Sequence, residues 1–373
     1  MMRLLSLIVV GIFLRSTECL ALEGGISAQP SSSSIPLEHP YPFDLTNPTL
    51  IFISGKDEYI HVMNYITQQE VTRIKVESSS FMRFTPDGQN LLVWDQCNHT
   101  INMLNTHVWQ QSARSIAVGQ QTRDLKIVPN NQYALGVHCC SNSASIINLH
   151  TLEKEKDIKV GRAPSSIQLT LDGKYALITN YWDCSISVIS LQMLLEKSKN
   201  IPLIKNPFVI QMSLDGQYAF VTHYNDNSIS VINLETLQYE KDIKVAHNAS
   251  LMQMTLDGQY ILVAYPEINS IGILKLYPSQ ENYKTVNLPI RPHLLQVLNE
   301  RYALTGNCEC KELQMINIYT GEVTSLTLDF YPYHITTFPL SAVEMLKKKE
   351  QQNNLFRLQR QNGLTDIVIM REY

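Results

Sequence analysis

The sequence predicts an all-β protein built from one repeated unit. A segment that begins at Ser165 and reads SSIQLTLDGKYALITNYWDCSISVIS recurs with small changes from Phe208 and from Ser250. The turn inside each copy returns at intervals of 43, 42, 43, 42 and 42 residues, at Asp87, Asn130, Asp172, Asp215, Asp257 and Asn299. Short alternating apolar runs with a period of about 40 to 45 residues are typical of β-propellers, in which one repeat forms one four-stranded blade.

Each repeat contains four strands, which we label a to d in chain order. In the copy from Ser165, the run IQLTL predicts strand a over residues 167–171. The Asp172-Gly173 pair predicts a tight turn into strand b at 175–179. A polar connection, NYWDC, leads to strand c at 185–190, and strand d lies near 200–204. The period-two pattern of each run is that of strands in antiparallel blades.

The number of strands predicts seven blades and the way in which the ring closes. Strand b occurs seven times, from Leu50, Leu91, Ala134, Ala176, Ala219, Ile261 and Ala303, but strand a occurs only six times between these points. The run HITTFPL from His334 supplies the missing strand a, so we expect this C-terminal strand to be the innermost strand of blade 1. An eighth blade is the alternative. The next apolar run, from Leu355, comes too late for a tight turn.

The ends of the chain differ in character from the repeats. Residues 1–21 resemble a signal peptide, with Arg3 before an apolar stretch at 4–14 and small residues near Ala21; an uncleaved anchor or leader is the alternative. Residues 22–48 are rich in proline and serine and predict a flexible lead into a propeller at 49–340. Residues 341–373 form an extension with a predicted short helix and strand. The leader predicts export to the periplasm or the outside of the cell.

The composition argues against a nucleic-acid partner. The formal net charge is −4 and charged residues make up 17% of the chain, so neither a basic footprint nor a polyanion is evident. The apolar stretch at residues 4–14 is too short to cross a bilayer as a helix. We therefore expect no transmembrane span in the mature chain.

Several short segments resemble the YVTN-type β-propeller repeats of exported bacterial and archaeal proteins. These are ALITN from Ala176, AFVTH from Ala219, the LDGKY and LDGQY turns, and SISVINLETL from Ser228. The resemblance covers residues 50–340 and is strongest at 134–276. It implies a propeller fold, an exported setting and a binding role, and it carries no set of catalytic residues.

Two series of side chains are predicted to lie on the face that carries the b-to-c and d-to-a connections, which we call the loop face. The ends of the seven b strands hold Ser54, Asp95, His138, Asn180, His223, Tyr265 and Asn307. Positions just before strand a hold Arg162, Lys205, His247 and Arg291. If the second series surrounds the channel mouth, it would favour an anionic ligand. The alternative is that these are solvated loop residues.

The cysteines left after signal removal all fall in b-to-c connections. They are Cys97, Cys139, Cys140, Cys184, Cys308 and Cys310. An even number in an exported chain predicts disulfides, with Cys97–Cys139 and Cys140–Cys184 as one pairing among several and Cys308–Cys310 as a strained bridge. His138 and His99 lie beside these thiols, so a zinc or copper site is the alternative to disulfides. No metal-binding spacing is present, and we therefore expect neither a metal nor a cofactor.

No catalytic motif is present. The sequence lacks GxSxG, GxxxxGK[ST], GxGxxG and HExxH patterns. Aromatic residues near the loop face suit a protein contact, namely Trp94, Tyr181, Trp182, Tyr224 and Tyr265. The alternative is that Trp94 and Tyr265 cover the cores of neighbouring blades. We therefore predict a non-catalytic binding or scaffolding propeller that holds a protein or an anionic ligand. The alternative is a propeller hydrolase such as a lactonase, using His138, His223, Arg162 and Arg291.

Overall fold

The structure is a computed structural model in which the compact unit that holds the repeats runs from Phe43 to Tyr373. It describes residues 50–76, 81–95, 98–106, 109–111, 115–129, 131–191, 196–276 and 283–337. The predicted signal peptide, the N-terminal lead, the C-terminal extension and Cys97 lie outside the described residues. Among the residues described, no helix is long and apolar enough to cross a membrane.

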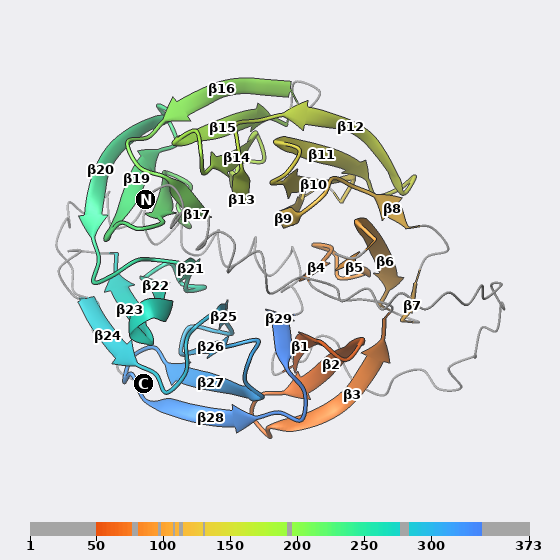
Figure 1. The fold of residues 1–373 in the computed structure, drawn as a ribbon, viewed down its shortest axis with the longest axis vertical. Coiled ribbons are helices and arrows are strands. Elements are labelled where there is room, and N and C mark those ends of the chain that lie inside the picture. The colour runs from red at the N-terminus through yellow and green to blue at the C-terminus, as the bar shows by residue number, and fades with distance from the viewer. Residues whose placement is uncertain are drawn as a thin grey trace, which may run out of the picture. The chain divides into compact units, whose positions relative to one another are not determined.

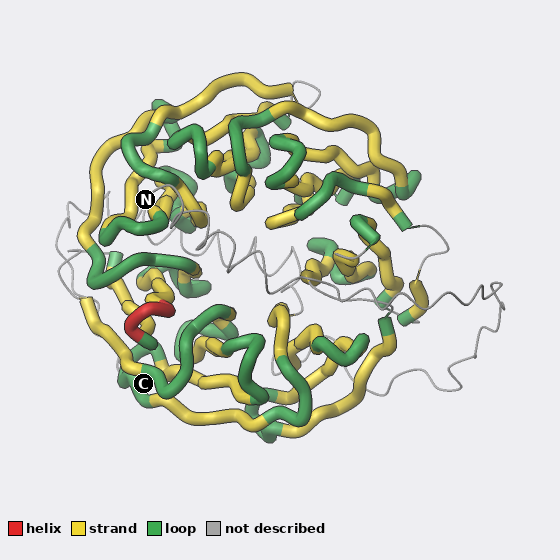
Figure 2. The backbone as a smooth tube through the Cα atoms, in the orientation of Figure 1, coloured by secondary structure: helices red, strands yellow, loops and turns green. Residues whose placement is uncertain are grey.

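Seven antiparallel sheets are arranged around a common centre, which confirms the predicted seven-bladed ring (Figures 1 and 2). The first four blades, from the inside outward, are β29 (Pro332–Thr337), β1 (Leu50–Gly55), β2 (Tyr59–Asn64) and β3 (Gln69–Lys75); β4 (Phe81–Phe84), β5 (Asn90–Asp95), β6 (Thr100–Asn105) and β7 (Gln110–Gln111); β9 (Thr122–Ile127), β10 (Tyr133–His138), β11 (Ser143–Asn148) and β12 (Glu153–Lys159); and β13 (Pro164–Leu169), β14 (Tyr175–Asn180), β15 (Ser185–Ser190) and β16 (Glu196–Pro202).

The remaining three blades follow the same order. They are β17 (Pro207–Met212), β18 (Tyr218–His223), β19 (Ser228–Asn233) and β20 (Gln238–Lys244); β21 (Leu251–Met254), β22 (Tyr260–Tyr265), β23 (Ser270–Lys275) and β24 (Tyr283–Asn287); and β25 (Leu294–Val297), β26 (Tyr302–Gly306), β27 (Glu312–Asn317) and β28 (Val323–Thr327). Blade 2 departs from the pattern, because β8 (Ile116–Ala117) also pairs with β6. One short 3-10 helix, η1 (Pro266–Ile268), lies in the described part of blade 6.

The C-terminal strand closes the ring as the strand count predicts. Strand β29 pairs antiparallel with β1, with Ile53 opposite Ile335 and Phe52 opposite Thr336. The first and last described strands therefore share one sheet, so the inner edge of blade 1 is paired rather than open.

The repeated LDG motif makes the tight turn between strands a and b. In blade 4, the Thr170 hydroxyl donates to Asp172 Oδ1 at 2.7 Å, and the Lys174 backbone amide donates to the same oxygen at 3.0 Å. Gly173 has φ +69°, a left-handed conformation that glycine adopts at low cost. Because Thr170 belongs to this turn, strand a ends at Leu169 rather than at residue 171.

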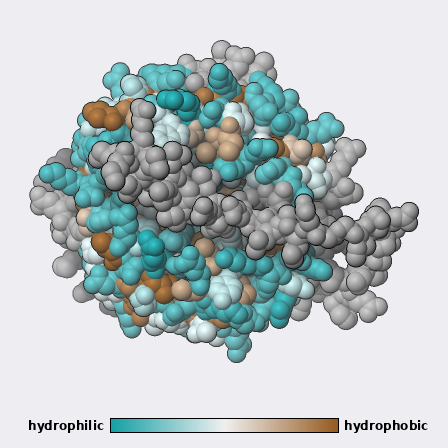
Figure 3. Space-filling model, in the orientation of Figure 1, coloured by the Kyte–Doolittle hydropathy of each residue, from teal (hydrophilic) through white to brown (hydrophobic). Residues whose placement is uncertain are grey.

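The apolar core lies between neighbouring blades. Between blades 3 and 4, for example, Val137 and Ile146 pack with Ile167 and Ile178. Strand b is apolar on both faces because each face meets a neighbouring blade. The outer strands are charged, as in the sequence EKEKDIK of β12, which discourages pairing with other chains. The face in Figure 3 is mainly hydrophilic, with scattered apolar patches.

Candidate functional site

The innermost strands of the seven blades lie around the centre of the ring, which we call the channel (Figure 1). On these strands, residues packed into the blades alternate with residues at two further levels, most of which are half-buried, whereas Ser166 and Thr336 are buried. The level nearer the loop face holds Phe81, Asp124, Ser166, Val209, Leu251, Leu294 and His334. The level nearer the tight turns holds Arg83, Lys126, Gln168, Gln211, Gln253, Gln296 and Thr336, which occupy equivalent register positions opposite strand b.

The charges in these two levels gather on one side, in blades 2 and 3. Arg83 Nη2 lies 3.9 Å from Asp124 Oδ1, and Lys126 Nζ lies 4.0 Å from the same oxygen. The other carboxylate oxygen of Asp124 accepts from the Ser166 hydroxyl at 3.1 Å and from the Ile167 amide at 3.2 Å. Two cations therefore share one carboxylate, which is itself held by blade 4.

Two buried nitrogen atoms in this cluster have no hydrogen-bond partner among the described residues. They are Arg83 Nε and His334 Nδ1. Phe81 separates the two side chains, with its ring centroid 4.4 Å from that of His334 and 4.9 Å from Arg83 Cζ. A buried polar nitrogen that lacks a partner is costly, so it favours a ligand that can pair with it. We call Phe81, Arg83, Asp124, Lys126 and His334 the channel cluster.

Burial shapes the protonation of the channel cluster. Desolvation, followed by repulsion from Arg83, lowers the pKa of Lys126 to about 8 against the attraction of Asp124. Desolvation also lowers the pKa of Arg83, which Asp124 partly restores. The pKa of His334 falls well below its usual value because of burial and the two nearby cations. Near neutral pH, His334 is therefore uncharged while Arg83 and Lys126 carry protons.

The channel cluster remains reachable although it is surrounded by strands. The side chains of Arg83 and Lys126 keep 30% and 24% of their surface accessible. This cluster was not predicted from the sequence, because only the alternating apolar residues of strand a were considered and not the polar residues between them. A signal was present: four repeats carry glutamine at a position where two others carry Arg83 and Lys126.

The predicted series of cations before strand a is on the loop face, but each member is already engaged. Arg162 Nε donates to Asp183 Oδ1 at 2.5 Å, and Lys205 Nζ lies 2.9 Å from both Asp226 and Asp242. His247 Nδ1 lies 3.3 Å from Glu267 Oε2, and Arg291 Nε donates to the Pro266 carbonyl oxygen at 3.2 Å. The carboxylate partners of Arg162, Lys205 and His247 reduce the positive charge that these residues offer to a ligand.

The predicted series at the ends of the b strands does not line an open face. Ser54, Asp95, His138, Asn180, His223, Tyr265 and Asn307 are all buried. In blade 3, His138 Nε2 lies 2.7 Å from Ser145 Oγ, and that hydroxyl donates to Asp157 on the outer strand. The same relay joins His223, Ser230 and Asp242 in blade 5. The side chains of His138 and His223 therefore connect strands b, c and d within their blades.

The relay continues with other residue types. In blade 4, Asn180 Nδ2 donates to Ser187 Oγ at 2.9 Å, and Ser187 donates to Asn200 Oδ1 at 3.2 Å. Asp95 accepts from the Asn98 amide, and Asn307 accepts from the amide of Glu309. Burial lowers the pKa of His138 to about 4, opposed by Asp157. Thr122 Oγ1 lies 2.8 Å from His138 Nδ1, so both ring nitrogens of the neutral histidine are hydrogen-bonded. This arrangement indicates a structural role for His138.

The predicted disulfides are not present among the described cysteines. Cys139, Cys140, Cys184, Cys308 and Cys310 are free thiols. Cys184 Sγ accepts from the Asn206 side-chain amide at 3.5 Å, on the connection that leads into blade 5, rather than pairing with a thiol of blade 3. Burial raises the pKa of Cys140 and of Cys308, so these thiols are poor nucleophiles at neutral pH.

The aromatic residues of the loop face divide into two groups. Trp94 and Tyr265 are buried and cover blade cores. Tyr181 contacts Trp182 edge to face at 4.9 Å and Tyr224 at 6.1 Å between ring centroids. Trp182 is exposed, so this second group presents an aromatic surface over blades 4 and 5.

Comparisons with known proteins support the fold and do not assign a family. The sequence matches no protein-family model and no curated protein. A functionally unknown protein from Desulfotomaculum acetoxidans superposes with a TM-score of 0.67 at 14% identity, over 78% of this chain and 98% of that one. A candidate 6-phosphogluconolactonase from Bacteroides fragilis superposes with a TM-score of 0.66 at 14% identity, over 79% and 99%.

A third similar structure belongs to an enzyme of different chemistry. The hydrazine synthase of Kuenenia stuttgartiensis superposes with a TM-score of 0.62 at 18% identity, over 72% of this chain and 93% of that chain. At these identities the likeness establishes the propeller fold alone, and proteins with this fold differ widely in activity.

Proposed function

We propose that this chain is a binding propeller that holds a small anionic ligand in its central channel. The observation that carries the proposal is the channel cluster, in which Arg83 and Lys126 share the single carboxylate of Asp124. A carboxylate or phosphate would supply the missing negative charge beside Arg83 and Lys126, whose side chains keep 30% and 24% of their surface accessible. The low-dielectric walls of a channel strengthen such an interaction.

The anion-binding part of the sequence prediction therefore moves from the loop-face cations to the channel. Charge favours the move, because Arg162 and Lys205 already contact carboxylates whereas the channel cluster has two cations for one carboxylate. Solvent exposure also favours the channel cluster over the loop-face cations as the anion site, because Arg162 is 70% exposed and water weakens its interactions.

Calorimetric titration with inorganic phosphate and a series of mono- and dicarboxylates tests the proposal. We expect at least one anion to bind, and Arg83→Gln or Lys126→Gln to weaken its binding by roughly tenfold or more, the effect of losing one charge-assisted hydrogen bond. Arg162→Ala is the matched control, since it removes a loop-face cation, and it should leave the affinity unchanged. The proposal fails if no anion binds or if Arg162→Ala weakens binding as much as Lys126→Gln.

A propeller hydrolase remains the second candidate, because one similar structure is a candidate 6-phosphogluconolactonase. The residues that the sequence suggested for this chemistry do not support it. His138 uses both ring nitrogens inside blade 3, and His223 Nε2 bonds Ser230. His138 therefore has no free ring nitrogen to act as a general base, and His223, whose Nδ1 has no hydrogen-bond partner among the described residues, is fully buried. Turnover of a panel of lactones that is lost in Lys126→Gln would instead place hydrolysis at the channel cluster.

The exported setting, the YVTN-type family and a protein partner on the loop face stay predictions. The aromatic surface of Tyr181, Trp182 and Tyr224 supports the last of these, because exposed aromatic groups are enriched at protein interfaces. N-terminal sequencing of the mature chain tests the cleaved signal peptide on which the prediction of export rests: a start near residue 22 supports cleavage, and an intact Met1 contradicts it.

A further inference from the structure

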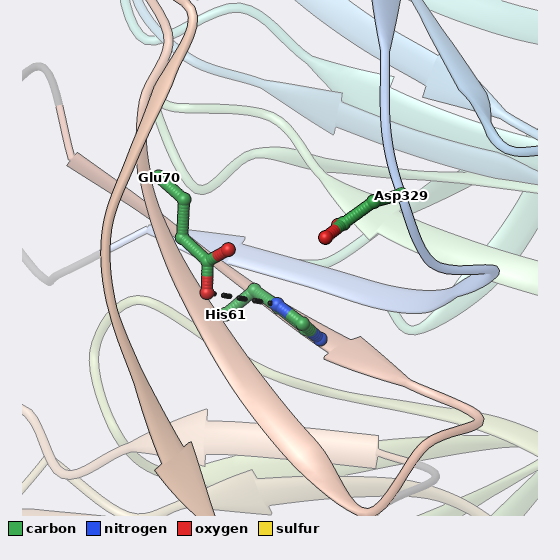
Figure 4. A group of neighbouring side chains, drawn as sticks. All are labelled: His61, Glu70 and Asp329. Atoms are coloured by element: carbon green, nitrogen blue, oxygen red, sulfur yellow. Dashed lines mark hydrogen bonds and ion pairs between the residues drawn. The ribbon is translucent and has the colours of Figure 1, made fainter.

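A buried histidine lies between acidic side chains where the ring closes. His61 belongs to β2, Glu70 to β3 and Asp329 to the connection between β28 and β29 (Figure 4). The ligand atoms of these three side chains all lie within 4.8 Å of one another. The His61 side chain is 1% exposed, and its ring stacks on Phe330 with centroids 3.4 Å apart.

Both ring nitrogens of His61 face carboxylates. Nε2 lies 3.1 Å from Asp57 Oδ2, and Nδ1 lies 3.2 Å from Glu70 Oε1. A neutral imidazole has one N–H, and a carboxylate can only accept. If Nε2 donates to Asp57, the Nδ1 lone pair faces another acceptor across 3.2 Å. That contact is favourable only if a second proton or a metal ion lies between the two atoms.

The surrounding groups distinguish these two solutions. Metal-bound histidines commonly donate their other N–H to a carboxylate, which is the position of Asp57. The Asp329 side chain points toward Glu70 and His61 in Figure 4 but makes no hydrogen bond with His61. Asp329 therefore adds nothing to the two hydrogen bonds of a doubly protonated ring, whereas it would be the third ligand of a metal ion.

We propose that His61, Glu70 and Asp329 bind one divalent transition-metal ion. One imidazole and two carboxylates suit ions that accept nitrogen and oxygen ligands, and water would complete the coordination shell. Two cations lie near the acidic side chains of Asp57, Glu70 and Asp329. Arg73 Nε lies 3.4 Å from Glu70 Oε1, and Lys311 donates to the Asp329 carbonyl oxygen, so the three carboxylates are only partly neutralised. The ion would tie the connection that enters β29 to β2 and β3 of blade 1.

This site is independent of the channel cluster and would serve ring closure. The closing strand β29 comes from the end of the described chain, while β2 and β3 come from its beginning. A metal ion that joins them would resist opening of the ring at blade 1. Because the ion binds only when these segments meet, its binding free energy adds to the stability of the closed ring.

Titration of the chelator-treated full chain with Mn²⁺, followed by electron paramagnetic resonance, tests the site. Mn²⁺ is the probe because the cysteines that the structure describes are free, and sulfur ligands favour softer ions. We expect one bound Mn²⁺ per chain and a rise in Tm of roughly 3 to 5 °C at a free Mn²⁺ concentration about 100 times Kd.

Asp329→Asn separates the metal site from a doubly protonated histidine. It should weaken Mn²⁺ binding at least tenfold and leave the Tm of the metal-free protein unchanged. Glu322→Gln, which removes an exposed carboxylate from another loop of blade 7, is the matched control and should bind Mn²⁺ as the wild type does. The proposal is overturned if the wild type binds no Mn²⁺ at millimolar concentration, or if Asp329→Asn binds it with unchanged affinity.

Discussion

Replacing Lys126 with glutamine should make the protein more stable at pH 7 while removing one of the two charges proposed to bind an anion. Glutamine occupies the equivalent position in blades 4 to 7, so the substitution fits the strand. Burial and Arg83 lower the pKa of Lys126 from 10.5 to about 8. That shift corresponds to an upper bound of about 3 kcal/mol for holding the protonated side chain in the folded protein. We expect Lys126→Gln to gain about 1 to 3 kcal/mol.

The stability difference between Lys126→Gln and the wild type should depend on pH. Between pH 8 and 10.5 the unfolded chain holds the Lys126 proton more tightly than the folded protein does. The free energy of unfolding of the wild type therefore rises with pH across that window as Lys126 loses its proton. The extra stability of Lys126→Gln over the wild type should shrink accordingly. Urea unfolding of both proteins at pH 7 and near pH 10 measures the change. A variant that is less stable at pH 7, or whose advantage is the same at both values, refutes the reasoning.

Three further predictions test the interior relays and the loop face. Ser145→Ala should lose about 1 to 3 kcal/mol in urea unfolding, because His138 Nε2 and Asp157 lose their buried partner; Ser141→Ala, in the adjoining turn, should change stability little. Wild-type stability should fall by up to about 3 kcal/mol as the pH drops from 6.5 to 4, because the pKa of His138 is about 4 in the folded protein; His138→Asn should reduce this loss, and an unchanged pH profile would contradict it. Arg162→Ala should change the free energy of unfolding by less than about 1 kcal/mol because its pair with Asp183 is exposed, and a larger loss would show that the pair is structurally important.

The repeats contained most of the information about the fold. The period locates each tight turn, and the run from His334 identifies the closing strand because one strand a is otherwise missing. The split outer edge of blade 2 was not predictable, because β7 and β8 are only two residues long and carry no clear alternation.

The candidate site was predicted less well, for two physical reasons. Residues at the ends of the b strands were expected on an open face, but partners seven residues later, such as Ser145 for His138, draw them into the blade. The channel cluster joins Arg83, Lys126 and His334 from three blades, so their proximity depends on ring closure. A single repeat shows which side chains face the channel but not which of them meet.

Anomalous diffraction from crystals soaked in bromide tests most directly whether the channel cluster binds anions. The proposal predicts an anomalous peak beside Arg83 Nε and Lys126 Nζ that disappears in Lys126→Gln. An empty channel in crystals whose loop-face cations bind bromide would contradict it.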